Sequence, residues 1–407
     1  MVSVLIPSNS NDYEAQLRRL TTCDPLPPFD PISIDFIDAV SKTVLRDPAM
    51  RSMPEMMATA HWMRKAHLLE LRDQFELQRG DRIWMARGVA LHFAPSNVDS
   101  IFVYSWFISL LLGNGNIVRL SQRRGPQVDV LLATLNTLLN EARFQPILQR
   151  SLIVSYEHEE ELSAKLSAVC HVRVLWGGDE SVRRLRAIPL NPVATEVAFA
   201  NRFSLAVLNA EAINQSDSAT LAGVAGKFFN DAYWFDQLAC SSPRLLAWAG
   251  TAEACKAAQN RFWPALELEL RKRGTEYPDM VGMNKLVSAY VSAASGIADQ
   301  ISPGVTGAVT RVHLKNSEVP FRSLECGGGF FFETEISDLH ELRHALSERD
   351  QTLSYFGFER DELKKFALTL PPRTIDRIVP LGTALDFSVV WDGNNLFRLF
   401  SREIDLI

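Results

Sequence analysis

A cysteine between a predicted helix and a predicted strand is the residue best placed for chemistry. Cys240 stands in FFNDAYWFDQLACSSPRLLAW, where a helical pattern gives way to polar turn residues and then to an apolar run. A thiol in such a turn can be exposed at a cleft, where a helix end or a donor would favour the nucleophilic thiolate. Most cysteines outside disulfides are instead small buried hydrophobic residues, so position alone leaves both interpretations open.

An asparagine follows the predicted strand VALHF at residues 89–93. Asn97 lies in HFAPSNV, between that strand and a predicted helix. An amide at the carboxyl end of a strand can donate a hydrogen bond to an oxyanion that develops during a reaction. Asn and Ser are also good N-cap residues, so capping by Asn97 or Ser96 is the competing interpretation.

Two further segments carry groups that can hold a phosphate. GNGNIVRLSQRRG places Arg119, Arg123 and Arg124 at and beyond the end of a strand, and guanidinium groups bind phosphate well. VLWGGDESVRRLR places Gly177 and Gly178 before a helix, whose first N–H groups can receive phosphate. The arginines can equally form a solvated surface, and WGGD is not the GxGxxG dinucleotide fingerprint.

Short apolar runs alternate with helical stretches from residue 88 onwards. Helical periodicity lies near 99–112, 126–142, 158–168 and 179–187. The apolar runs are VALHF (89–93), NIVRL (116–120), SLIVSY (151–156), HVRVLW (171–176) and SLAVL (204–208). This alternation predicts an α/β domain with a parallel sheet, helices on both faces and a site at the carboxyl ends of the strands.

A second α/β region is expected from Asn209, because a helix at 219–235 precedes further strands and long helices. A chain of 407 residues also exceeds what one core usually holds. The first thirty residues are polar and rich in proline, which predicts an arm or loop. We therefore expect four segments, at 1–50 (arm and helix), 51–208, 209–375 (with the cysteine) and 376–407 (strand-rich).

Composition and charge limit the partners. The chain has 22% charged residues and a net charge of −6, which provides no field that would attract nucleic acid or an anionic membrane. The longest apolar stretch, residues 101–112, is shorter than the roughly 20 residues that span a bilayer. The five cysteines form no CxxC pair and no cluster with metal-ligand spacing, so we expect no metal and a reducing, cytoplasmic location.

Four motifs, in this order, resemble the aldehyde dehydrogenase superfamily, and most closely its bacterial fatty acyl-CoA reductase (LuxC-like) branch. They are PSN at 95–97, GNGNIVRLS at 113–121, WGGD at 176–179 and QLACSSP at 237–243. The similarity covers roughly residues 80 to 400. It implies an aldehyde-dehydrogenase-like α/β fold, with a parallel-sheet nicotinamide-cofactor domain at 51–208 and an α/β catalytic domain at 209–375.

The resemblance also assigns roles to individual residues. Cys240 matches the nucleophile and Asn97 the oxyanion-hole asparagine. Glu196, in PVATEVAFANRFS, falls at the general-base glutamate, and Glu325, in SLECGGGFFF, at the glutamate that binds the nicotinamide ribose. The remaining cofactor-binding positions are Gly177, Gly178, Arg119 and Ser121.

Glu196 and two further features, His92 and an aromatic run, have plainer interpretations. Glu196 can instead form a salt bridge with Arg202 or another arginine. His92, which resembles a recurring family position, is better explained as a hydrogen-bonded core residue, because no base-like partner is evident. The aromatic run from Tyr233 to Phe235 can line an acyl tunnel or simply belong to the core.

The expected function is an acyl-CoA reductase that forms a fatty aldehyde through an acyl-cysteine and hydride from NADPH, with NADH as the alternative. Arg119, Arg123 and Arg124 favour NADPH because they can accept its 2′-phosphate. The expected donors are acyl-CoA or an acyl-protein thioester, with an acyl-transferring enzyme as partner and a homo-oligomer formed through the C-terminal segment. The alternatives are an aldehyde dehydrogenase working in the oxidative direction and a non-catalytic acyl-carrying subunit of an acyl-transfer complex.

Overall fold

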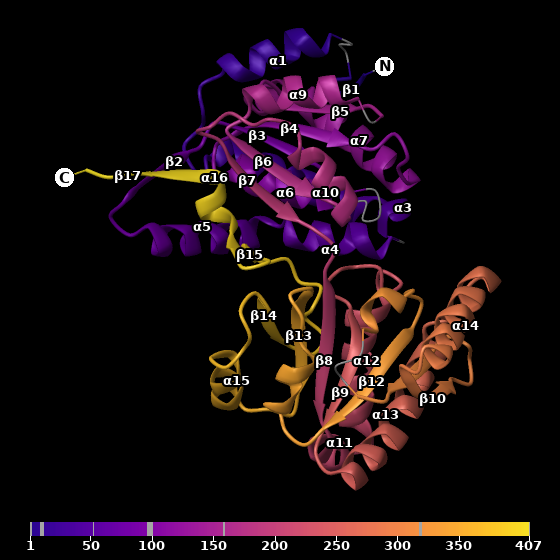
Figure 1. Ribbon diagram of the computed structural model, residues 1–407. Helices are drawn as coiled ribbons and strands as arrows, with labels where there is room; N and C mark the ends of the chain where they lie inside the picture. Colours follow the sequence, from indigo (N-terminus) through magenta and orange to yellow (C-terminus); the bar gives the residue numbers. More distant parts are fainter. Residues whose placement is uncertain are drawn as a thin grey trace. The chain divides into compact units, whose positions relative to one another are not determined.

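The computed structural model describes residues 2–8, 12–51, 53–95, 101–157, 159–316 and 320–406. The chain forms two compact units, each built around its own sheet (Figure 1). The first unit comprises Met1–Asn201 and Phe387–Ile407, and the second comprises Arg202–Asp386. Both chain ends thus pack within the first unit, whereas the sequence suggested separate terminal segments.

The first unit holds a six-stranded sheet in the order β1-β5-β4-β3-β6-β7. Every neighbouring pair is parallel except β1 with β5. The chain runs outward from β3 through β4 to β5 and then returns to β6, on the other side of β3. The strand order therefore reverses beside β3, and parallel sheets bind ligands at such a point. The strands are β1 (Ser3–Ile6), β3 (Val89–Phe93), β4 (Gly115–Leu120), β5 (Ser151–Ser155), β6 (Val172–Trp176) and β7 (Thr195–Phe199).

Helices cover both faces of this sheet (Figure 1). On one face lies α6 (Ile101–Leu111), which is buried along its whole length because it is apolar on every side, and α2 (Pro31–Arg46) and α7 (Pro126–Leu139) pack on that side. The other face carries α1 (Tyr13–Thr22), α9 (Glu160–Val169) and α10 (Asp179–Arg186), whose apolar side chains share one core with the strands. The remaining helices are α3 (Pro48–Arg51), α4 (Pro54–Trp62), α5 (Lys65–Arg79), η1 (Ala142–Phe144) and α8 (Gln145–Leu148).

The chain ends correct one prediction and bear out another. The first thirty residues are not an arm or loop, because β1 adds to the sheet beside β5 and α1 is capped by Asp12, which accepts a hydrogen bond from the backbone N–H of Ala15. The last thirty residues are rich in strands, as predicted, and also contain a short helix. These elements are β14 (Arg377–Pro380), β15 (Val390–Trp391), β16 (Asn394–Asn395), α16 (Leu396–Phe400) and β17 (Ser401–Ile404), which pairs with β2 (Ile83–Ala86).

The second unit holds a seven-stranded sheet in the order β10-β11-β12-β9-β8-β13-β14. Only the edge strand β10 runs antiparallel to its neighbour. The strands are β8 (Phe203–Asn209), β9 (Pro243–Ala249), β10 (Ala298–Pro303), β11 (Thr310–Leu314), β12 (Phe330–Ile336), β13 (Asp350–Phe356) and β14. The helices are α11 (Ala210–Gln215), α12 (Ser218–Tyr233), α13 (Ala252–Lys272), α14 (Asp279–Ala294) and α15 (Arg360–Ala367), with the 3-10 turns η2 (Arg322–Leu324) and η3 (Glu341–Ala345).

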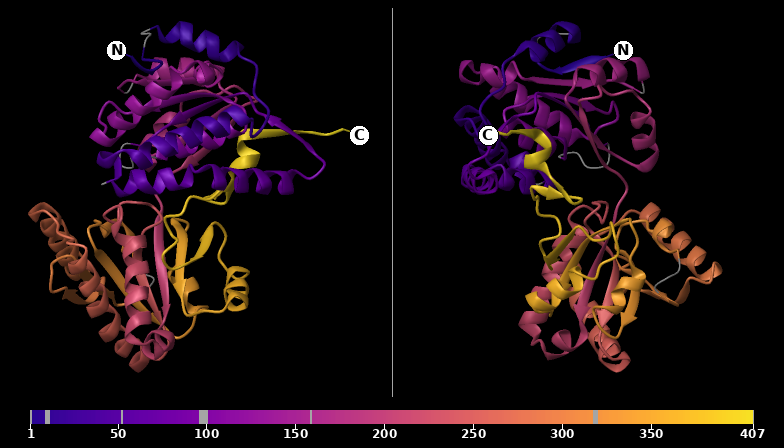
Figure 2. Two further views of the ribbon diagram at one scale, coloured as in Figure 1. Left: turned by 180° about the vertical axis from the view of Figure 1, so that it is seen from behind. Right: turned by 60° about the vertical axis from the view of Figure 1, so that its left-hand side comes forward.

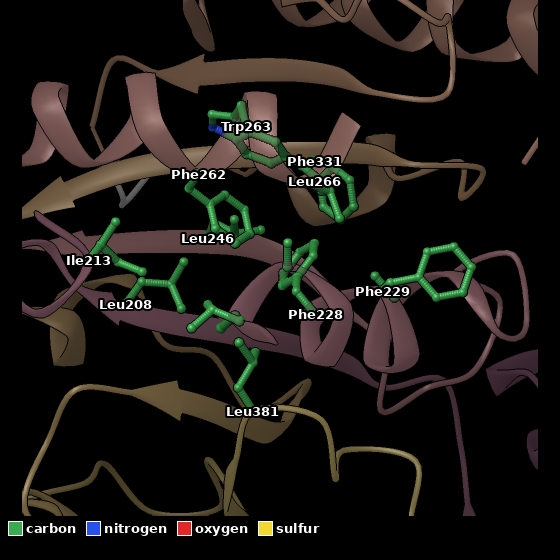
Figure 3. Packing of buried hydrophobic residues seen from close by; sticks show 14 of the residues in the cluster. Leu208, Ile213, Phe228, Phe229, Leu246, Phe262, Trp263, Leu266, Phe331 and Leu381 are labelled. Carbon is green, nitrogen blue, oxygen red and sulfur yellow. The ribbon is translucent and has the colours of Figure 1, made fainter. Parts of the chain in front are cut away.

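An aromatic core fixes α12 and α13 against this sheet (Figure 3). Phe228 of α12 lies at its centre, with its ring centroid 5.3 Å from Phe262 and 5.4 Å from Phe331. Such edge-on and tilted pairs are favourable beyond their buried area. Because α12 ends only ten residues before β9, this core anchors the helix that precedes the Cys240 turn. The described residues contain no helix long and apolar enough to cross a membrane.

Candidate active site

Cys240 lies in a tight turn between α12 and β9, three residues before β9 begins. The thiol residue is half-buried, and its backbone carbonyl accepts a hydrogen bond from the Ser204 hydroxyl at 2.7 Å. Asp236 and Gln237, earlier in the turn, have positive φ angles of 50° and 64°. Residues other than glycine hold this conformation only where their surroundings enforce it, and such strain clusters at functional sites.

Gln237 enforces the turn with a fully satisfied side chain. It is completely buried. Its amide nitrogen donates to the carbonyls of Pro243 at 2.9 Å and Phe330 at 3.0 Å, and its oxygen accepts from the N–H groups of Gly329 and Phe330, both at 3.1 Å. These bonds tie the cysteine turn to the start of β12, and losing any of them would leave a buried polar group unpaired.

Arg244 is a second organising residue of the turn. Its guanidinium donates to the carbonyls of Gln237 and Ala239, both at 3.3 Å, and approaches the carboxylate of Glu325 at 2.9 Å. One buried cation therefore contacts the residue before Cys240 and the glutamate expected to bind the nicotinamide ribose. Guanidinium groups suit this task because they present several donors in a rigid plane.

Three glycines follow Glu325 and bring this segment against the turn. Gly327, Gly328 and Gly329 all have positive φ angles, and a Cβ on Gly329 would meet the carbonyl of Ala308 at 1.9 Å. The N–H of Gly328 donates to the carbonyl of Asp236 at 2.9 Å. The structure thus brings Glu325 and the Cys240 turn together within the second unit.

In the first unit, two of the arginines predicted to bind phosphate, Arg119 and Arg124, have different surroundings. Arg119 lies at the carboxyl end of β4, where it donates to the carbonyl of Tyr156 at 2.8 Å and lies over that ring. Burial lowers the pKa of Arg119, and the positive charge of Arg184 on α10 lowers it further. Arg124 is instead paired with Asp129 at 2.6 Å, while Ser121 accepts from the backbone N–H of Arg123.

The glycines of the WGGD motif lie at the start of α10, at the carboxyl end of β6. Gly178 is the N-cap residue of this helix. Among the described residues, no heavy atom lies within 4 Å of the position that a Cβ on Gly178 would take. Packing therefore does not explain this glycine, whereas a phosphate on the first N–H groups of the helix would need such an open approach.

Glu196 lies near the amino end of β7, whereas these glycines follow the carboxyl end of the neighbouring strand β6. Its carboxylate contacts Arg173 at 2.5 Å and Arg186 at 3.1 Å. Arg173 is almost fully buried and faces Glu196 across neighbouring strands. The partners are therefore not Arg202, which pairs with Asp376 instead.

His92 is buried between Ser105 and Asn116, whose side-chain oxygens lie 2.8 and 3.1 Å from its ring nitrogens. Burial lowers the pKa of His92 to about 4, so the ring is neutral near pH 7. Tyr233 likewise belongs to the aromatic core, and its hydroxyl donates to the carbonyl of Ala308. Asn97 and Ser96 lie outside the described residues. The described part of the chain contains no group of three or more His, Cys, Asp or Glu side chains placed to hold a metal ion.

Comparison with known proteins finds one matching family and many solved structures with a similar fold. A family model described as "Acyl-CoA reductase (LuxC)" matches residues 64–402. No curated protein matches the sequence.

Among solved structures, an oxidoreductase from Marinobacter aquaeolei superposes with a TM-score of 0.69 and 10% identity, covering 97% of this chain and 89% of that one. An NAD-dependent benzaldehyde dehydrogenase from Corynebacterium glutamicum superposes with a TM-score of 0.65 and 13% identity, covering 96% of this chain and 86% of that one. Proline utilization A from Bradyrhizobium japonicum gives a TM-score of 0.63 and 13% identity over 96% of this chain, which spans only 44% of that longer one. At such low identity the likeness concerns the fold, which is that of the aldehyde dehydrogenases.

Proposed function

The chain belongs to the acyl-CoA reductase (LuxC) family, and from this premise we propose that it reduces an acyl thioester to an aldehyde through an acyl-cysteine on Cys240. The observation that carries the proposal is the construction of the Cys240 turn. Gln237 and Arg244 hold it in a strained conformation, and Arg244 joins it to Glu325. Strain maintained by buried polar groups is typical of a preorganised site.

In the first half of the proposed reaction, the Cys240 thiolate attacks the thioester carbonyl carbon. A new C–S bond forms, the tetrahedral oxyanion collapses, and the thiolate of coenzyme A leaves with the electron pair of the broken bond. Asn97 and a backbone N–H near Cys240 are proposed to stabilise the oxyanion. Acyl-CoA or an acyl-protein thioester can serve as donor in this chemistry.

In the second half, a nicotinamide nucleotide, when bound, would supply the hydride that reduces the acyl-cysteine. The residues present fit such a group. Gly178 leaves the start of α10 open after β6, while Arg119 lies at the carboxyl end of β4 and Ser121 directly follows that strand, with β3 between β4 and β6. Glu325 is proposed to hold the nicotinamide ribose. After reduction, the thiohemiacetal on Cys240 releases the aldehyde and restores the thiol.

We propose NADPH as the preferred nucleotide. In NAD-binding sheets, an acidic residue at the carboxyl end of one strand binds the ribose. With the strand order β5-β4-β3-β6-β7, β4 occupies the position of that strand. Here that position carries Arg119, Ser121 and Arg123. Cations and a hydroxyl suit a 2′-phosphate, whereas an acidic residue would repel it.

The deciding experiment measures nucleotide oxidation and aldehyde formation with a panel of acyl-CoA substrates, using NADPH and NADH in turn. Cys240→Ala is compared with the native protein, and Cys23→Ala is the control, because Cys23 is a half-buried thiol of the first unit. We expect Cys240→Ala to abolish turnover and Cys23→Ala to retain it. Turnover that survives loss of Cys240 would refute the mechanism.

Two other outcomes would select the alternatives. Steady oxidation of aldehyde by NADP⁺ in water, without reduction of any thioester, would indicate an aldehyde dehydrogenase. An acyl adduct on Cys240 that never yields aldehyde would indicate an acyl-carrying subunit that depends on a partner enzyme. Sedimentation of the native protein tests the proposed homo-oligomer.

A further inference from the structure

Helix α14 contains a buried lysine on a helix that otherwise exposes much of its surface. The helix lies along the outer side of the second unit in each view (Figure 2), and Met280, Met283 and Tyr290 are all exposed. Lys285 is only 3% exposed. An ammonium group is rarely buried unless its charge and its donors are compensated.

Backbone carbonyls compensate this charge. The Lys285 ammonium donates to the carbonyls of Gly307 at 2.6 Å and Gly328 at 2.9 Å, and it lies 5.2 Å from the centre of the Tyr277 ring. No carboxylate forms an ion pair with it in the part of the chain that the structure describes. Burial lowers the pKa of Lys285.

One of the two carbonyls that Lys285 binds belongs to the segment that contacts the cysteine turn. Gly328 accepts from the ammonium through its carbonyl, while its N–H donates to Asp236. The next residue, Gly329, donates to the side chain of Gln237. Asp236 and Gln237 are the two left-handed residues that shape the turn before Cys240.

We infer that Lys285 is a positioning residue for Cys240, acting through Gly328 on the turn that carries the nucleophile. This inference rests on the proposed function, because it assumes that Cys240 is the reacting group. Glu325 lies on the same glycine-rich segment. Lys285 therefore also fixes the segment proposed to hold the nicotinamide ribose.

The buried lysine has opposing effects on stability. A methionine would fill nearly the same space and avoid the cost of burying a charge, but it would leave the carbonyls of Gly307 and Gly328 without this donor. What methionine cannot do is donate two hydrogen bonds to Gly307 and Gly328. The chemical feature that distinguishes lysine here is the bridge between two loops.

The test compares Lys285→Met with Gln259→Met, which removes another buried side-chain hydrogen bond of the second unit. Gln259 donates to Glu335 near the carboxyl end of β12, whereas the cysteine turn contacts the amino end of that strand. The readouts are the rate of Cys240 alkylation by iodoacetamide as a function of pH, followed by peptide mass spectrometry, together with kcat, KM and Tm. Alkylation needs no substrate, so it tests the inference even if no thioester is reduced.

We expect Lys285→Met to lower kcat by about 10- to 100-fold, as small displacements of reacting groups do, with little change in the KM for the thioester. The rate or the pH profile of Cys240 alkylation should change as well, because both depend on the exposure and the thiolate fraction of the thiol. Gln259→Met should lower Tm and leave Cys240 reactivity unchanged. Lys285→Arg, which keeps cationic donors, should restore most of the reactivity.

Wild-type alkylation rates and pH profile in folded Lys285→Met would overturn the inference, and so would an equal loss in Gln259→Met. If Lys285→Met fails to fold, Lys285→Gln provides the test, because its shorter amide keeps a donor but lacks the charge and the reach of lysine. A changed rate or pH profile of Cys240 alkylation at native Tm then supports the positional role, and a lower Tm with native alkylation overturns it. Failure of the proposed function appears separately, as absence of turnover in native protein whose Cys240 still alkylates.

Discussion

At the scale of single residues, Glu196 shows how an ion pair and a catalytic base can be distinguished. Its carboxylate lies between Arg173 and Arg186, and Arg173 is almost fully buried. A base must be able to accept a proton during the reaction. Two guanidinium groups stabilise the charged carboxylate and occupy its oxygens, so these contacts favour a structural role.

Glu196→Gln should therefore reduce stability more than activity. Without the carboxylate, Arg173 becomes a buried cation lacking its counter-charge, and we expect a loss of about 2 to 3 kcal/mol, less than for a fully buried pair because Glu196 is partly exposed. Urea denaturation measures this loss, and kcat at 25 °C should change by less than about threefold. A large fall in kcat with unchanged stability would instead restore the general-base role.

At the scale of elements, Asp231 on α12 anchors the loop that follows β14. Its carboxylate accepts from the N–H groups of Gly382 at 2.7 Å and Ala384 at 2.9 Å. Burial raises the pKa of Asp231 from 3.8 to about 7, although these two N–H groups oppose the rise. The folded protein thus holds a proton on Asp231 that the unfolded chain has already lost at pH 6.

This difference makes stability fall as the pH rises. Below pH 3.8, Asp231 is protonated in both the folded and the unfolded state, so it does not change the free energy of unfolding with pH. Between pH 3.8 and about 7 the folded state binds more protons than the unfolded state. The free energy of unfolding therefore decreases as the pH rises through this range, by roughly 4 kcal/mol in total. Asp231→Asn removes this titration. Urea midpoints at pH 5, 6, 7 and 8 should therefore fall more steeply in the native protein than in the variant, and parallel slopes would contradict the prediction.

Elements were predictable where hydrophobic periodicity is strong. The strands β3, β5 and β6 and the helices α6 and α9 lie within a few residues of their predicted bounds. No strand was predicted at β7 or β13. The sequence of β7, TEVAF, has only three apolar residues after two polar, partly exposed ones, and that of β13, DQTLSYF, places polar side chains inside the sheet. Apolar periodicity cannot detect a strand whose buried positions are occupied by Asp350, Gln351 and Thr352.

The site was predictable only in part, for a related reason. Cys240, Glu325 and the glycines stand in recognisable local segments of the sequence. Arg244 and Lys285 do not, because their roles depend on backbone carbonyls of other segments, such as that of Gly328, 43 positions beyond Lys285. Only folding brings these donors and acceptors together, so no local motif marks them.

At the scale of the whole molecule, the proposed reaction divides between the two units. The proposed nucleophile, Cys240, and Glu325 belong to the second unit, while Gly178 and Arg119 belong to the first. The proposed acylation of Cys240 and the proposed binding of the nucleotide phosphates therefore use different parts of the chain. The two half-reactions should accordingly be separable by mutation.

Gly178→Ala provides the sharpest separation. An added Cβ meets no described atom within 4 Å, so the fold should tolerate it, but it narrows the approach of a phosphate to the start of α10. We expect the KM for NADPH to rise about tenfold or more, while acylation of Cys240 by acyl-CoA, followed by mass spectrometry without nucleotide, keeps its native rate.

Gly223→Ala is the matched control, because its Cβ also meets nothing and it lies in α12 of the second unit. An unchanged KM for NADPH in Gly178→Ala would place the nucleotide elsewhere, and slower acylation would show that the two half-reactions are not independent.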